Sequence, residues 1–271
     1  IINGTNSRGD YTGDTIKNGS TPWVQFSPYN FMHDGSPVKS NHFIIYSDSA
    51  SKKERIKLLR GLEIILRDLS IRLDIDTVNS DWYPTKVDPF IIYLNRTHKE
   101  VPFAFAYPRG MIIVSPDAKF FFNPSPGHYG RLIAHELTHS IDLAITQYSS
   151  SQPPVWFREG LAQLCSGLSE AQEITNREKL DMVIETTGID RSSWTPMSIR
   201  HYNDYPQELI SNKQEGLYYP LYELAVKYLV DPENTGKDIK EIVGFLDRIS
   251  IMNTFEEEFI KTFGLSIERY E

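Results

Sequence analysis

Short apolar runs and longer amphipathic stretches alternate in the first half of this sequence. The runs 42–47 and 89–94 consist mainly of β-branched and aromatic residues, and each has the length of a β-strand. Between them, large apolar residues recur every three or four positions, which is typical of one buried face of an α-helix. The pattern therefore predicts a strand, a helix over about 52–73 and a second strand. The apolar positions of the helix are Leu58, Leu62, Ile65, Leu66 and Leu69.

A hairpin and then a series of helices are predicted after the second strand. The runs 103–107 and 111–115 are separated by Pro108-Arg109-Gly110, which is typical of a hairpin or a tight bend. Gly127 and Gly130 precede a predicted helix over about 130–147. One further helix is predicted to begin near Val155. Glycines, prolines and asparagines then delimit five more predicted helices, over about 170–187, 217–230, 237–250, 254–263 and 266–271.

The sequence therefore predicts an α+β protein in three parts. Residues 1–41 are rich in polar residues, glycine and proline, and we expect them to form a polar N-terminal extension. Residues 42–147 form a subdomain that contains the strands and ends in the helix over 130–147. Residues 148–271 form a mainly helical subdomain.

Charge, apolar content and cysteine count limit the kinds of partner and environment that the chain suits. The chain has 271 residues with 36 acidic and 28 basic side chains, a net charge of −8. No basic stripe is evident, so we expect no nucleic-acid partner, because phosphate binding needs clustered Lys and Arg. The apolar runs are strand-sized, so no transmembrane segment is predicted. The single cysteine, Cys165, excludes an intramolecular disulfide and leaves the compartment open.

Residues 135–139 read His-Glu-Leu-Thr-His, which places two histidines four positions apart. In a helix such positions lie on the same face, so His135 and His139 are able to bind one metal ion together. Zinc favours imidazole nitrogen and carboxylate oxygen, and a catalytic zinc site keeps one coordination position for water. Glu136 lies about 100° further round the helix. We predict one Zn²⁺ per chain, held by both histidines, with Glu136 as the general base.

A third zinc ligand is needed, and the segment 156–163 (Trp-Phe-Arg-Glu-Gly-Leu-Ala-Gln) offers Glu159. This carboxylate follows His139 by 20 residues. The intervening loop contains Pro153 and Pro154 and is long enough for a second helix to turn back and pack on the first. Glutamate is also common near helix starts for electrostatic reasons, so the assignment depends on its combination with residues 135–139.

Together these two segments resemble the gluzincin metallopeptidases, in which HExxH is followed by a glutamate ligand on the next helix. Residues 135–139 are similar to the thermolysin form of the motif. Residues 156–162 resemble the third-ligand segment of the bacterial peptidase MA-like proteins and, more distantly, of the M1 aminopeptidases. The resemblance covers about residues 42–271 in the order of elements. It implies zinc, a zincin-like mixed sheet beside the active-site helix, a helical subdomain that carries the third ligand, and hydrolysis of a peptide or protein substrate.

Two positions depart from these relatives. M1 aminopeptidases bind the free amino terminus of the substrate with a Gly-x-Met-x-Asn stretch, which no segment before the motif matches here. Thermolysin-like enzymes have an aspartate one turn after the glutamate ligand, where this chain has Gln163. Gln163 is able to orient a ligand by hydrogen bonding but carries no charge.

Related enzymes stabilise the oxyanion of the transition state with a Tyr or His from the helical part. Tyr219 fits best by its spacing to Tyr228 and Leu229, and Tyr218 and His201 are alternatives. With 15 tyrosines in the chain, simple packing is an ordinary role for any of these tyrosines.

Other positions near the motif have more than one interpretation. The strand Met111–Ser115 is either an edge strand that pairs with an extended peptide substrate or an ordinary core strand. Asp142 either hydrogen-bonds near the metal or faces solvent. Cys165 is expected to be a small buried hydrophobic residue.

The sequence thus predicts a zinc metallopeptidase. Glu136 takes a proton from the metal-activated water and passes it to the leaving amine, while Tyr219 stabilises the oxyanion. Two alternatives stay open. One is a catalytically inactive module that binds zinc or peptide, and the other is an amidohydrolase that acts on a non-protein amide such as a cell-wall crosslink. Because relatives of this kind are often exported, we expect an extracellular or cell-envelope location by analogy.

Overall fold

The computed structural model divides the chain into two compact units. The first consists of residues 1–68 and 77–144, and the second of residues 69–76 and 145–271. The residues that the structure describes are 36–47, 50–75, 89–94, 104–107, 110–113, 128–146, 153–167, 178, 181, 185, 219–251 and 254–270.

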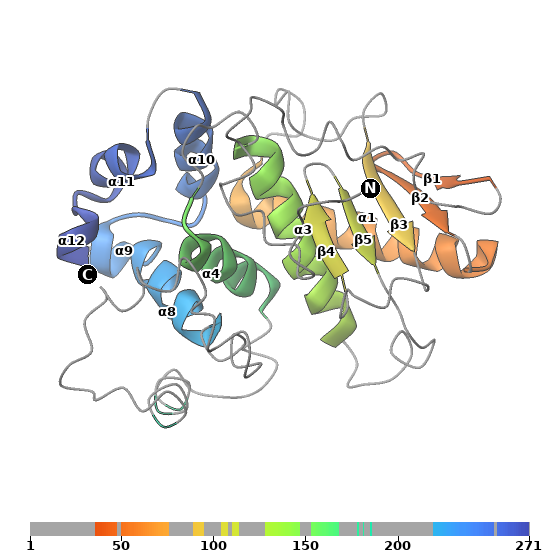
Figure 1. Ribbon diagram of the computed structural model, residues 1–271, viewed down its shortest axis with the longest axis horizontal. Coiled ribbons are helices and arrows are strands. Elements are labelled where there is room, and N and C mark those ends of the chain that lie inside the picture. The colour runs from red at the N-terminus through yellow and green to blue at the C-terminus, as the bar shows by residue number, and fades with distance from the viewer. Residues whose placement is uncertain are drawn as a thin grey trace, which may run out of the picture. The chain divides into compact units, whose positions relative to one another are not determined.

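The first unit contains a five-stranded mixed sheet with the order β1-β2-β3-β5-β4. Strands β2, β3 and β5 run parallel, whereas β1 and β4 are antiparallel to their neighbours. Figure 1 shows these strands together with helices α1 and α3. The predicted α+β class and the mixed sheet are confirmed. The elements are β1 (Val38–Lys39), β2 (Phe43–Ser47), α1 (Lys52–Leu73), β3 (Phe90–Leu94), β4 (Ala104–Tyr107), β5 (Gly110–Ile113) and α3 (His128–Thr146).

The core of the first unit follows from the alternation of side chains along β2 and β3. Phe43 pairs with Phe90 and Ile45 with Ile92, so all four lie on one face of the sheet, and all are fully buried. The two phenylalanine rings stack with their centroids 5.6 Å apart. Three of the five positions predicted for the apolar face of α1 are buried: Leu62, Leu66 and Leu69 are at most 2% exposed. The other two, Leu58 and Ile65, are partly exposed.

A polar contact fixes the start of β2 against α1. Glu63 accepts a hydrogen bond from the backbone N–H of His42 at 3.1 Å, and its other carboxylate oxygen lies 2.7 Å from His42 Nδ1. Burial by itself raises the pKa of the Glu63 carboxyl, but hydrogen bonds from Ser40 and His42 outweigh it. The pKa therefore lies below its ordinary value of 4.5.

We expect Glu63→Gln to lower the free energy of unfolding by about 1 kcal/mol near neutral pH, because the amide keeps the shape but not the charge. A carboxyl with a lowered folded-state pKa stabilises the fold above pH 4.5, and this contribution is lost as the pH falls through the folded-state pKa. Urea denaturation of wild type and variant at about pH 7 and about pH 3 measures the difference. An equal difference in unfolding free energy between wild type and variant at both pH values would contradict a stabilising role for the Glu63 charge.

The second unit is helical among the residues that the structure describes. An aromatic cluster joins the first turn of α4 to the C-terminal helices: the Trp156 ring stacks on Tyr270 at 5.8 Å, and Phe157 contacts Phe245 and Phe255. The Tyr270 hydroxyl donates a hydrogen bond to the Ala225 carbonyl of α8. The elements are α4 (Val155–Ser166), α8 (Tyr219–Leu229), α9 (Pro232–Thr235), α10 (Glu241–Ile251), α11 (Phe255–Phe263) and α12 (Ile267–Tyr270).

Two predicted elements differ from those observed. The predicted strand Met111–Ser115 corresponds to β5, which lies between β3 and β4, so the edge-strand interpretation of that segment is wrong. The helix predicted from 237 begins at Glu241. Asp238 and Glu241 account for the later start: the Asp238 N–H donates to the Glu241 carboxylate, and the Asp238 carboxylate accepts from the Lys240 N–H.

Several predictions fall on residues outside the described part of the chain. They include most of the helix over 170–187 and nearly all of the N-terminal extension over 1–41. The described part of this extension contains β1, which pairs with β2. Among the described residues, no helix has the length and the apolar character required to cross a membrane.

Candidate metal site

The His-Glu-Leu-Thr-His segment lies in the middle of α3, as the motif requires. The apolar side of this helix is buried: Ile133, Leu137, Ile141 and Ala144 are at most 2% exposed. An amphipathic helix with such a face is stabilised mainly by packing. The buried side therefore fixes the helix, and with it the direction in which the histidines project.

His135 and His139 form a pair with the spacing of two ligands of one metal ion. Their Nε2 atoms lie 3.1 Å apart, and the side chains are 6% and 8% exposed. Two nitrogens that each lie about 2.0–2.1 Å from one tetrahedral zinc ion are separated by about 3.3 Å. The rings meet edge to face with centroids 4.7 Å apart, which lets both nitrogens converge without overlap of the rings.

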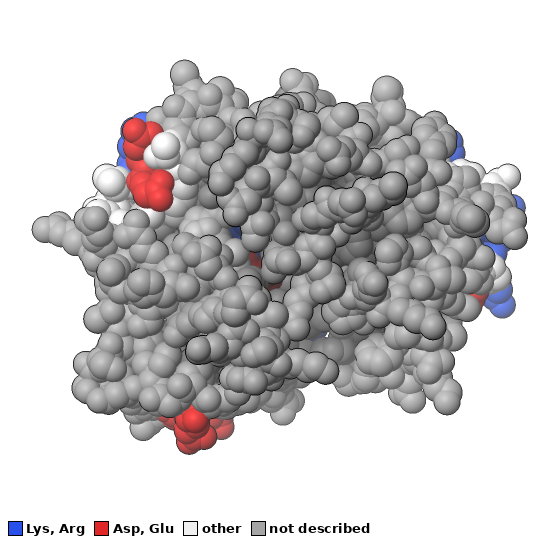
Figure 2. All heavy atoms as spheres, in the orientation of Figure 1, with Lys and Arg blue, Asp and Glu red and all other residues white. Residues whose placement is uncertain are grey.

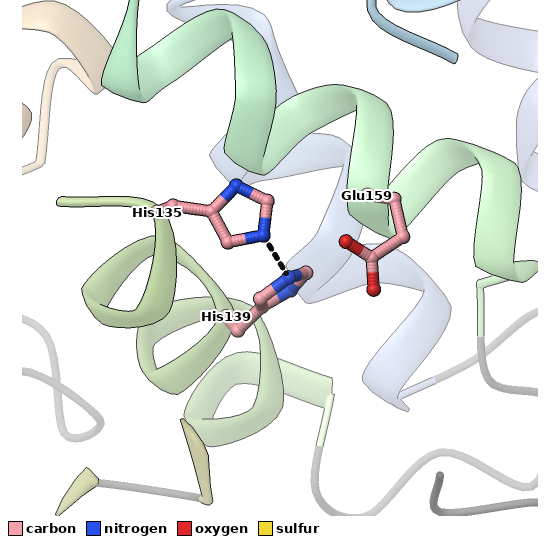
Figure 3. Close-up of side chains that lie close together, drawn as sticks. All are labelled: His135, His139 and Glu159. Atoms are coloured by element: carbon pink, nitrogen blue, oxygen red, sulfur yellow. Dashed lines mark hydrogen bonds between the residues drawn. The ribbon is translucent and has the colours of Figure 1, made fainter. Parts of the chain in front are cut away.

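Glu159 on α4 completes a group of three metal-ligating side chains. One carboxylate oxygen of Glu159 and one ring nitrogen of each histidine all lie within 4.8 Å of one another. Figure 3 shows the three side chains pointing toward one another. Two imidazoles and one carboxylate are the donors of a catalytic zinc site that keeps a fourth position open. The donor set and the nitrogen spacing thus fit zinc.

Burial on α4 explains why Glu159 is held in place. Trp156 and Phe157 are at most 2% exposed and anchor the first turn in the aromatic cluster, whereas Glu159 is partly exposed. The helix ends at Ser166 and is capped by Gly167, which adopts the left-handed conformation with φ 61° and donates its N–H to the Gln163 carbonyl. The predicted start near Val155 is confirmed.

Gly160, directly after Glu159, allows α4 and α8 to approach closely. A Cβ atom at this position would lie 2.2 Å from the Tyr222 carbonyl oxygen and 2.7 Å from Val226 Cγ2. The absence of a side chain therefore sets the separation of the two helices. Since α8 begins at Tyr219, the helix with the candidate oxyanion residue packs directly on the helix that carries Glu159.

The structure locates two of the remaining candidate catalytic residues. Glu136 is partly exposed, unlike its buried neighbours His135 and Leu137. Tyr219 is partly exposed, and its ring lies 6.5 Å from that of Tyr222. The alternatives Tyr218 and His201 lie outside the described residues.

The other predicted neighbours of the motif are buried. Asp142 is 2% exposed, so the interpretation that it faces solvent is wrong. Cys165 is a free, buried cysteine, as expected. Gln163, one turn after Glu159, is 7% exposed, and its Oε1 atom has no hydrogen-bond partner among the described residues.

Ser140 is a structural residue of the site that the sequence did not reveal. Its hydroxyl is fully buried next to His139 and lies within hydrogen-bonding range of two carbonyl oxygens, those of Gly110 and Glu136. Gly110 is the first residue of β5, so this contact ties the helix of the histidines to the sheet. A serine after the motif gives no signal of such a contact, because its partner is distant in sequence.

We expect Ser140→Ala to lower the free energy of unfolding by about 1–2 kcal/mol, because it removes the donor to a buried carbonyl. Thr138→Val is the matched control: the Thr138 hydroxyl is equally buried but donates only to Ala134, one turn earlier in the same helix. That carbonyl lies in the helix ladder, so the control should cost less. Urea denaturation measures the unfolding free energy of both variants. An equal decrease in the two would show that the hydrogen bond to β5 does not stabilise the fold more than a bond within the helix does.

No protein-family model and no curated protein matches this chain.

Proposed function

We propose that this protein is a zinc-dependent peptidase of the gluzincin type. Its metal ligands are His135, His139 and Glu159, and its general base is Glu136. The observation that supports this most strongly is the convergence of the three ligand atoms within 4.8 Å of one another. The ligands come from two helices, and the spacing of the histidines within α3 leaves Glu136 beside them.

The proposed chemistry assigns a role to each residue. A bound zinc ion would supply the Lewis acid that makes water reactive near neutral pH. Glu136 accepts the proton of the attacking water and delivers it to the leaving amine. Tyr219 donates a hydrogen bond to the oxyanion of the transition state. The close packing of α8 on α4 supports this role, because Tyr219 and Glu159 lie on two helices in direct contact.

The sheet supports a peptide as substrate. Strand β4 has β5 on one side and no second partner strand among the described residues. An extended peptide adds to such an edge through backbone hydrogen bonds, with side chains alternating in direction. The antiparallel β4 at the end of a mixed sheet, followed in sequence by β5 and then by the helix of the histidines, also supports a zincin-like architecture.

Metal analysis combined with a digest of a diverse peptide mixture tests the proposal. We expect about one zinc per chain, cuts detected by mass spectrometry, loss of the cuts after chelation, and their return when zinc is added. Zinc without any cut by the wild-type protein would favour the inactive binding module. Absence of zinc after incubation with the metal would contradict the site itself.

A further inference from the structure

The exposed surface of α1 is strongly basic, although the chain as a whole has a net charge of −8. Six of its exposed residues are Lys or Arg, one is acidic and two are isoleucine. They are Lys52, Lys53, Lys57, Arg60, Ile64, Arg67, Asp68, Ile71 and Arg72. Figure 2 shows Lys and Arg atoms at the right-hand margin, where the first turns of α1 lie in Figure 1.

Six of these residues form a single line along the helix, here named the outer face of α1. Their positions are separated alternately by four and three residues, the spacing that keeps side chains on one side of a helix. The outer face consists of Lys53, Lys57, Arg60, Ile64, Arg67 and Ile71. The sequence did not reveal this basic stripe, because acidic residues are interspersed with it along the chain.

The acidic side chains of α1 lie outside the outer face. Glu54 accepts a hydrogen bond from the backbone N–H of Ser51 at 2.7 Å, and Glu63 binds His42. Asp68 is exposed but lies 3.8 Å from Arg67, a distance at which an exposed pair is weak. The outer face therefore carries four cations and no acidic residue of its own.

Two isoleucines within the basic stripe are unusually exposed. Ile64 is 53% exposed and Ile71 is 67% exposed, whereas the leucines on the opposite side of α1 are buried. The two lie seven positions apart, so they project from the same side of the helix. Apolar side chains of this size gain free energy from transfer out of water.

We propose that the outer face of α1 binds an anionic lipid surface. Lys53, Lys57, Arg60 and Arg67 contact the headgroups, and Ile64 and Ile71 enter the boundary with the acyl chains. Clusters of basic residues on a helix with exposed apolar side chains have this property, and each basic residue strengthens binding about fivefold. A nucleic-acid backbone is the less suitable partner, because it satisfies the cations but leaves both isoleucines in water.

Sedimentation of the full chain with lipid vesicles tests the proposal. One set of vesicles consists of phosphatidylcholine alone, and the other contains phosphatidylserine as well. We expect binding to the second set only, weakening at high salt. Neutralisation of all four cations to Gln should reduce binding at least tenfold, and the double variant Ile64→Ser, Ile71→Ser should also reduce it severalfold. Circular dichroism establishes that each variant is folded.

Ile260→Ser is the matched control, because Ile260 on α11 is similarly exposed at 49% and lies outside the outer face. It should bind anionic vesicles like the wild-type protein. Equal binding to both sets of vesicles, or a similar loss in the control, would overturn the proposal. A protein that binds a fluorescent oligonucleotide but no vesicle, with the isoleucine variant unaffected, would overturn it in favour of a nucleic-acid surface.

Discussion

Glu136→Gln should lower the turnover number for a cleaved peptide by about 10³-fold or more while zinc remains bound. The amide has nearly the size and the helix propensity of the carboxylate, so α3 should keep its position. It cannot accept the proton of the attacking water at neutral pH, which removes the general base. Glu136 is not one of the three converging ligands, so the metal content should not change. The measurement is steady-state kinetics on one peptide, with metal analysis of the same sample.

The same substitution at two other positions makes this test specific. Glu159→Gln replaces a proposed ligand and should lower the zinc content, in addition to activity. Glu63→Gln changes a carboxylate on α1 that binds His42 and should leave turnover unchanged. Full activity of Glu136→Gln would refute the general-base role, whereas loss of zinc from it would show that Glu136 supports the metal rather than the proton transfer.

The parts of the site that the sequence predicted best depend on local geometry. His135 and His139 lie one turn apart on one helix, so the helix alone brings their nitrogens together. The prediction of Glu159 as a ligand depended on a second helix folding back on the first. Its convergence with the histidines is therefore a property of the tertiary structure. The relation of Glu136 and Tyr219 to a bound peptide remains a prediction, because it depends on an interaction with a second molecule.

The features that the sequence did not reveal arise from contacts between distant segments. The Ser140 hydroxyl finds its partner in Gly110, and the open space that Gly160 provides is occupied by the Tyr222 backbone. The periodic pattern reports only whether a position is apolar, so in the described chain it missed the short helix α9 and the two-residue strand β1. It does not report which strand lies at the edge, and for that reason the sequence left open whether Met111–Ser115 is an edge strand or a core strand, whereas β4 lies at the edge among the described strands.

The charge on α1 was hidden for a related reason. Composition sums Lys, Arg, Asp and Glu regardless of where they project, and the sum for the chain is −8. The fold separates them, because Glu54 and Glu63 hydrogen-bond to the backbone near the start of α1 and of β2, while the cations face outward. The net charge therefore gives no information on how charge is segregated on one helix, whereas spacing together with burial does.

Gly160→Ala should strongly destabilise the fold, although it adds only one methyl group. The new Cβ would lie 2.2 Å from the Tyr222 carbonyl oxygen, and no side-chain rotation relieves a clash with backbone. The helices α4 and α8 must therefore separate, at a cost of about 3 kcal/mol in the free energy of unfolding. Because Glu159 is the preceding residue, the same shift should weaken zinc binding. Urea denaturation and competition with a chelator measure the two effects.

Gly61→Ala is the matched control for the added methyl group. Gly61 lies within α1, and a Cβ there meets no atom within 4 Å. Alanine favours the helix over glycine, so this variant should be more stable than the wild-type protein by about 0.5–1 kcal/mol. If Gly160→Ala matched the wild-type protein in both stability and zinc affinity, the close approach of α4 and α8 would not be what positions Glu159. A loss confined to Gly160→Ala would link the packing of these two helices to the metal site.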